Sequence, residues 1–173
     1  MVSLDDPLPP VVAGSIQQFG RAEMAGSADN PVEVLAGAAQ AGLRWSVVVF
    51  GDSDDLYTLI RVYREDRLLV PGSGFGGPSL PAGSAVSEWR GRTDDLPYFV
   101  MARTLPDVDR VVATTNQGLE VELAISAPSP EFGLRFAAAA LPDGHAPSRL
   151  RVERGGIVLQ ACPQPMGRSR EAE

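Results

Sequence analysis

The strict alternation of apolar and polar residues from Leu119 to Ile125 restricts the fold of this chain more than any other feature. Apolar side chains stand at positions 119, 121, 123 and 125, with Glu or Ala between them. A period of two places one face of a β-strand on a core and the other in solvent. The preceding residues 109–115 are also β-favouring, and the Asn-Gln-Gly sequence at 116–118 suits a tight reversal. Residues 109–125 therefore predict a β-hairpin.

Similar runs recur along the chain. They predict strands at residues 43–50, 56–63, 68–70, 84–90, 98–103, 132–141, 149–154 and 157–159. The 18 glycines and 15 prolines suit many short strands joined by turns, and they do not suit a helical bundle. We therefore expect an all-β domain, an immunoglobulin-like or related β-sandwich of about 8–10 short strands.

Residues 30–42 carry two competing signals. Asn30, Pro31 and Glu33 form a helix-start signature ahead of an alanine-rich stretch. Against a helix, residues 32–36 alternate and Gly37 interrupts the pattern. We favour a strand, a turn and a second strand, while a helix remains the alternative.

The chain length of 173 residues fits one domain. Residues 1–30, rich in Pro and Gly, are expected to form an extended N-terminal arm. Residues 31–161 are expected to form the sandwich, and residues 162–173 a charged C-terminal tail.

Charge and cysteine content exclude several classes of protein. The net charge is −7 and all 15 basic residues are arginine, so nucleic acid and membrane surfaces are poor partners. A single cysteine, Cys162, allows no internal disulfide. One His and one Cys do not supply a zinc shell, and no cofactor is expected. There is no signal-peptide pattern and no run of about 18 apolar residues, so the expected location is cytoplasmic.

The order of several short motifs resembles that of a known group of domains. These motifs are residues 32–37 before 43–45, the Gly-Phe-Gly element at 74–76, residues 106–112 with 118–121, and residues 131–136 with 141–144. Together they resemble small β-sandwich domains of high-GC Gram-positive (actinobacterial) bacteria, over about residues 30–160. The resemblance implies architecture only, because that group has no assigned activity. Many members carry a cysteine beside the Gly-Phe-Gly element, where this chain has Ser73.

Ser53 raises a first functional alternative. The Gly-Asp-Ser sequence at 51–53 follows an apolar run, as in GDS-type serine esterases. A serine nucleophile needs a histidine base and an acid that orients it. The only candidates are His145 and Asp143, and that family places its Asp three residues before the histidine instead of two. A polar turn between two strands is the competing interpretation, and we favour it.

The aspartates raise a second alternative. Asp52, Asp54 and Asp55 precede one predicted strand, and Asp94 and Asp95 precede another. If both loops met at one end of the sandwich, their carboxylates could bind calcium, as in an adhesion-like domain. Aspartates are also common in turns for local reasons.

Two aromatic residues are the predicted binding residues. Phe75 lies in the Gly- and Pro-rich stretch 71–83, which we expect to be a loop that exposes it. Its glycines match a dinucleotide fingerprint, but Pro78 and Pro81 prevent the helix that such a site needs. Trp89 is the second candidate. We expect a non-catalytic module that binds a protein or a small ligand, or that pairs with a second copy through a sheet edge.

Overall fold

The computed structural model describes residues 16–17 and 30–163, and the regular elements in these residues are all strands. In chain order they are β1 (Ile16–Gln17), β2 (Val32–Ala38), β3 (Leu43–Gly51), β4 (Leu56–Arg64), β5 (Arg67–Phe75), β6 (Val86–Gly91), β7 (Phe99–Thr104), β8 (Arg110–Thr115), β9 (Glu120–Glu122), β10 (Ala124–Ile125), β11 (Arg135–Ala140), β12 (Pro147–Arg154) and β13 (Ile157–Pro163). The all-β prediction is confirmed. No helix of a length and apolarity that would cross a membrane occurs in this part of the chain.

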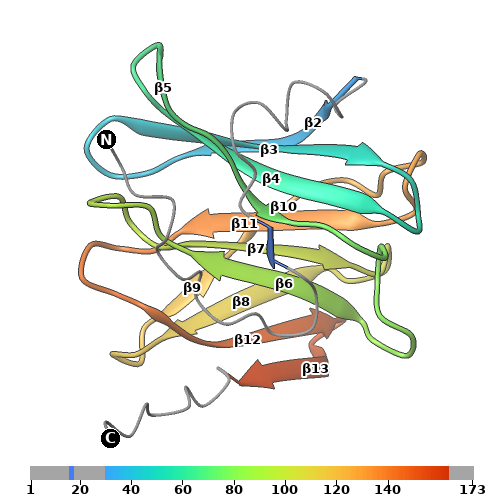
Figure 1. Cartoon of the computed structure of the whole chain (residues 1–173). Coiled ribbons are helices and arrows are strands. Elements are labelled where there is room, and N and C mark those ends of the chain that lie inside the picture. The colour runs from blue at the N-terminus through green and yellow to red at the C-terminus, as the bar shows by residue number, and fades with distance from the viewer. Residues whose placement is uncertain (1–15, 18–29, 164–173) are drawn as a thin grey trace, which may run out of the picture.

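The strands form three antiparallel sheets. Sheet A has the order β1-β5-β4-β3-β2, sheet B the order β10-β11-β7-β6, and sheet C the order β13-β12-β8-β9. The sheets lie on one another as three layers, with sheet B in the middle (Figure 1). An immunoglobulin-like sandwich has two sheets, so the stack has one layer more than the sequence predicts.

One apolar core lies between sheets A and B. Both tryptophans belong to it, together with aliphatic residues from sheet A and aromatic residues from sheet B. Its buried members are Leu43, Trp45, Val47, Val49, Leu56, Ile60, Val62, Val70, Phe75, Trp89, Phe99, Met101, Leu134, Phe136 and Ala138.

A second core lies between sheets B and C. It is made of smaller side chains, Val, Leu and Ala, and its buried members are Val86, Val100, Ala102, Val108, Val111, Ala113, Leu123, Ala137, Ala139, Leu141, Leu150 and Val152. Successive residues of a strand point to opposite faces, so β7 and β11 supply both cores. All six residues of β7 are buried.

Residues 119–125 do not form one strand. Glu120–Glu122 pair with β8 in sheet C, whereas Ala124 and Ile125 pair with β11 in sheet B. Leu123 is buried where the chain passes between the two layers, and its N–H still bonds to Val111 O at 2.9 Å. The alternation predicts burial only in part, because Leu123 is buried, Val121 and Ile125 are half-buried and Leu119 is exposed.

Residues 32–38 form a strand, so the helix alternative is wrong. β2 pairs with β3 in a register that places Gly37 opposite Trp45. The indole of Trp45 occupies the space above Gly37, where an added Cβ would come within 2.3 Å of it. Gly37 is therefore required by close packing.

The prediction of a loop at residues 71–83 is wrong for residues 71–75, which belong to β5. β5 continues to Phe75, and its last residues pair with β4 on one side and with β1 on the other. Gly74 faces the Thr58 carbonyl so closely that a Cβ would meet it at 2.0 Å. These glycines permit a close approach of strands, and here they do not mark a turn.

The structure describes only parts of the expected N-terminal arm and of the expected C-terminal tail. Of the expected N-terminal arm, the structure describes Ile16, Gln17 and Asn30, and the rest of the arm lies outside the described residues. β13 extends through Cys162 to Pro163, so the first two residues of the expected tail belong to sheet C. Residues 164–173 lie outside the described part of the chain.

Candidate functional site

The residues of the esterase hypothesis are not brought together. Ser53 lies in the β3–β4 connection, where its carbonyl accepts from the Ser79 N–H at 2.9 Å. His145 lies in the β11–β12 connection, with Asp143 two residues before it, and its Nδ1 is 3.0 Å from Thr115 Oγ1. The two connections are at opposite ends of the stack (Figure 1). A serine and its base must be in hydrogen-bond reach, and this arrangement does not provide that.

The β11–β12 loop is instead fastened to the β8–β9 turn. The His145 ring bonds to Thr115, the Gln117 side chain donates to Gly144 O at 3.0 Å, and Asn116 Oδ1 accepts from the Ala146 N–H at 3.0 Å. Asn116 thus holds the β8–β9 turn against the β11–β12 loop. These contacts give His145 a structural role.

The two acidic loops also lie at opposite ends of the stack. The β3–β4 connection, with Asp52, Asp54 and Asp55, is at one end and the β6–β7 connection, with Asp94 and Asp95, is at the other (Figure 1). Within the described residues, no group of three His, Cys, Asp or Glu side chains is placed to hold a metal ion.

The aspartates of the first loop have local partners. Asp52 Oδ1 accepts from the backbone N–H groups of Asp54 and Asp55 at 3.0 and 3.1 Å. Asp55 accepts from the Tyr57 hydroxyl at 3.1 Å, and that carboxylate adds to burial in raising the pKa of Tyr57. These bonds match the local role that aspartates often have in turns.

Phe75 is not an exposed anchor. Its side chain is 1% exposed, and the guanidinium carbon of Arg103 lies 4.2 Å from the centre of its ring. The reason is the extension of β5, which turns Phe75 into the core between sheets A and B.

Arg103 is the largest fully buried side chain among the described residues, and sequence reasoning missed it. It projects from β7 toward sheet A, where its Nε donates to Thr58 Oγ1 at 2.8 Å and its two Nη atoms donate to the carbonyls of Leu56, Phe75 and Pro78. None of these partners is a carboxylate, and burial lowers the pKa of Arg103 to about 10. The guanidinium therefore joins two sheets and the 77–78 loop.

Trp89 is buried, at 6% exposure, and lines a narrow pocket between sheets A and B. The pocket has room for about one water molecule. Trp89 therefore does not offer a site for a larger ligand in this conformation.

A buried ion pair links the edges of sheets B and C. Glu88 and Arg90 lie on the face of β6 that points toward sheet C, with their nearest side-chain atoms 2.7 Å apart. Arg90 also donates to Cys162 O on β13 at 3.0 Å. Burial raises the pKa of Glu88 although Arg90 opposes that shift, and burial together with Glu88 raises the pKa of the Cys162 thiol. A half-buried thiol of raised pKa is not an activated nucleophile.

The outer face of sheet C carries a network of alternating charges. Arg151 bonds to Glu120 and Glu153, and Arg110 bonds to Glu122 and Glu153. The hydrogen bond from Arg151 lowers the pKa of both Glu120 and Glu153.

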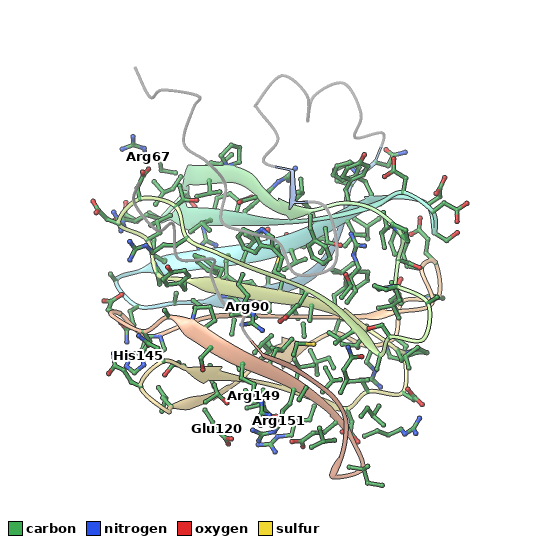
Figure 2. All side chains as sticks on the ribbon, turned by 60° about the horizontal axis from the view of Figure 1, so that its bottom comes forward. Arg67, Arg90, Glu120, His145, Arg149 and Arg151 are labelled. Atoms are coloured by element: carbon green, nitrogen blue, oxygen red, sulfur yellow. The ribbon has the colours of Figure 1, made fainter. Side chains whose placement is uncertain are left out.

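Arg149 lies on the same outer face without a side-chain partner among the described residues. Figure 2 shows Glu120, Arg149 and Arg151 together on this face, far from Arg67 on the other side of the stack. The face therefore has three arginines and three glutamates, and its charges cancel.

Directly after the turn of the β12–β13 hairpin stand the most exposed large apolar side chains of the described residues. Ile157 is 68% exposed and Val158 is 51% exposed, directly after the turn at Gly155 and Gly156. Both glycines have positive φ, as a two-residue hairpin turn requires. The sequence contained a signal for this exposure, because three consecutive apolar residues at 157–159 cannot all face one core.

Comparison with known proteins yields no relative: no family model, curated protein or solved structure matches this chain.

Proposed function

We propose that this chain is a non-catalytic interaction module that binds through the tip of the β12–β13 hairpin, residues 155–159. The scaffold we propose for it is a β-sandwich related to the immunoglobulin type and extended by a third sheet. The observation that carries the proposal is the exposure of Ile157 and Val158 on a strand at the edge of sheet C. Exposed apolar residues on a sheet edge favour pairing with another strand.

The middle of β13 is engaged with sheet B and with the β5–β6 connection, although the side chain of Ala161 is exposed. Arg90 donates to Cys162 O, and the Gln160 side chain accepts from Ser84 Oγ at 3.0 Å and from the Ala85 N–H at 2.8 Å. Pairing with a partner is therefore confined to the first residues of the strand, next to the turn.

Other sheet edges have the usual protection against pairing. β9 is three residues long and carries two glutamates. β1 pairs only with Gly74 and Phe75 of β5, and the part of β5 before these residues contains Pro71, which has no N–H to donate. β2 contains a bulge between Glu33 and Leu35. The pairing of β13 with β12 also has an irregularity, at Val152 and Glu153, but the tip beyond it carries the two most exposed large apolar side chains of the described residues.

The partner that we propose is a second copy of the chain, joined edge to edge at β13. The net charge of −7 opposes self-association in general. The outer face of sheet C next to this edge has balanced charges, however, so the local repulsion is small. An isologous pairing would also bury the same two apolar residues from both copies.

The test is the mass of the protein in solution as a function of concentration. We expect the parent chain to shift from monomer to dimer in sedimentation or light scattering, and the double variant Ile157→Lys/Val158→Lys to stay monomeric. The matched control is Leu68→Lys/Leu119→Lys, which adds the same charge at side chains 43% and 42% exposed, and it should dimerise like the parent. A parent chain that stays monomeric at millimolar concentration contradicts the proposal.

Catalysis is not part of the proposed function, because Ser53 and His145 lie on loops at opposite ends of the stack (Figure 1). We expect the protein to leave generic acyl esters and serine-directed phosphonates unreacted. Ester turnover that disappears in Ser53→Ala would overturn this part of the proposal.

A further inference from the structure

The outer face of sheet A, which points away from sheet B, carries a small apolar cluster. It consists of Val48 and Phe50 on β3 and Leu59 on β4, with half-buried Tyr57 packed against them. The rings of Phe50 and Tyr57 are stacked, with their centroids 5.0 Å apart. The alternate residues of both strands belong to the core between sheets A and B, so the four side chains of this outer cluster point the other way.

The outer cluster is too deeply buried for a sheet face that is open to solvent. Val48 is 3% exposed and Leu59 is 0% exposed. Toward the edge and the far end of the same face, Glu33 and Arg44 are exposed and Arg61 is half-buried. Sheets B and C lie on the other side of sheet A (Figure 1), and among the described residues the cluster contains side chains of β3 and β4 alone. A narrow cover from outside the described residues accounts for this burial.

One row of paired residues crosses sheet A from edge to edge through this cluster. The row begins on β1, passes over β5, β4 and β3 and ends on β2, and its members are Gln17, Gly74, Leu59, Val48 and Glu33. Neighbouring strands lie about 4.8 Å apart, so the row is about 19 Å long. The chain leaves β1 at one end of this row and enters β2 beside the other end, so the shortest path between the two strands passes over the outer cluster.

The connection from β1 to β2 contains residues 18–29, which lie outside the described residues. Four antiparallel pairings separate the two strands, so they run in the same direction. Parallel strands of one sheet need a crossover of about a dozen residues or more, and this connection has twelve. Twelve extended residues reach about 40 Å, about twice the length of the row. The inner face of sheet A is filled by the core with sheet B, which leaves the outer face for the crossing.

We propose that residues 18–29 dock on the outer face of sheet A and cover the outer cluster, with Phe19 and Met24 as the apolar contacts. These two are the large apolar side chains of the connection. Of the other residues outside the described part of the chain, 164–173 follow sheet C and 1–15 are attached to sheet A at one end only. The docked segment also holds β1 against the end of β5, which closes that edge to another strand. This surface is separate from the edge of β13.

The first test is the nuclear Overhauser effect between methyl groups of the full chain. We expect cross-peaks from the Met24 methyl group to the methyl groups of Val48 and Leu59. A sample that mixes labelled and unlabelled chains separates contacts within one copy from contacts between copies. The proposal is overturned if the cross-peaks to Val48 and Leu59 arise only between copies, if they come from residues 1–15 instead, or if none connects them with residues 18–29.

The second test is the double variant Phe19→Asp/Met24→Asp, which places charges on the two proposed contacts. A soluble gadolinium chelate should relax the methyl groups of Val48 and Leu59 severalfold faster in this variant than in the parent. Val49 is 0% exposed on the inner face, and its unchanged relaxation is the control for folding. The matched variant Phe19→Leu/Met24→Leu keeps apolar contacts and should behave like the parent. Parent-like relaxation of Val48 and Leu59 in the Asp variant overturns the proposal, and if that variant unfolds, the cross-peaks of the parent chain decide.

Discussion

Sheets B and C differ in how many of their faces are covered by other strands. Sheet C has one face in the core and one in solvent, so its strands alternate between apolar and charged residues. Sheet B is covered on both faces, and its β7 and β11 are apolar throughout except at Arg103 and Thr104 and at the end residue Arg135. The comparison shows that position in the stack decides what a charged residue does: on sheet C it faces water, while on sheet B it must be surrounded by partners.

Among the substitutions that test this difference between the sheets, we expect the largest loss of stability at Arg103. Replacement by leucine removes the guanidinium donors to the carbonyls of Leu56, Phe75 and Pro78, and a buried polar group that is left unpaired costs about 1–3 kcal/mol. We expect Arg103→Leu to lower the free energy of unfolding by about 3–5 kcal/mol, measured by urea denaturation. Arg103→Lys keeps the charge but not the fork of donors, and a loss equal to that of leucine would show that geometry alone matters.

The second prediction concerns space in the middle layer. Ala138 on β11 is fully buried in the core between sheets A and B, whereas Ala161 on β13 is exposed. We expect Ala138→Leu to destabilise the protein by about 1–3 kcal/mol through overpacking. Ala161→Leu should change stability by less than about 0.5 kcal/mol. Equal thermal shifts for the two variants would mean that the middle layer has free volume.

A smaller effect, of opposite sign in the two sheets, is expected with pH. The folded state raises the pKa of Glu88, chiefly by burial. Protonated Glu88 therefore stabilises the fold below the unfolded pKa of about 4.3. This stabilisation is lost as the pH rises through the folded pKa. The folded state lowers the pKa of Glu153, chiefly through its bond from Arg151, so that stabilisation is present above the unfolded pKa and is lost as pH falls through the folded pKa.

The measurement is the urea midpoint of Glu88→Gln and of Glu153→Gln from about pH 3 to pH 7. Relative to the parent, Glu88→Gln should gain stability as pH rises, and Glu153→Gln should lose it. Slopes of the same sign would contradict the assigned pKa directions.

The smallest effect is expected on the outer face of sheet C. Arg149 is exposed and has no side-chain partner in the described residues, so Arg149→Ala should change the free energy of unfolding by less than about 0.5 kcal/mol. Arg151→Ala breaks two ion pairs of the network and should cost more than Arg149→Ala. If Arg149→Ala proves the costlier of the two, the network does not stabilise this face.

The difference between the two sheets also explains what the sequence could predict. Sheet C follows from alternation and from the two-glycine turn before Ile157, and its β12–β13 hairpin is confirmed. The sequence also predicts the strands of sheet B. It does not predict that sheets A and C cover both faces of that sheet. Arg103 at the end of an apolar run is typical of a solvated strand end, and nothing in one sequence shows that three carbonyls converge on it.

The candidate site was less predictable than the fold. The sequence predicts a loop at Phe75 because Gly and Pro surround it, whereas Gly74 permits the close approach of β5 and β4. Exposure of Ile157 and Val158 depends on which strand lies at the edge of its sheet, and that order is set by pairings between strands distant in sequence, such as β12 with β8.

The order of strands along the chain has a consequence for synthesis. β2 to β5 pair in sequence, so sheet A can form once residues 32–75 have been made. Sheet B needs β11, which begins at Arg135, and its central pairing with β7 waits until then. A growing chain thus displays the apolar inner face of sheet A while about 60 more residues are added, which exposes it to aggregation in that interval. Shielding of the nascent chain therefore matters most at the face of sheet A that later forms the core with sheet B.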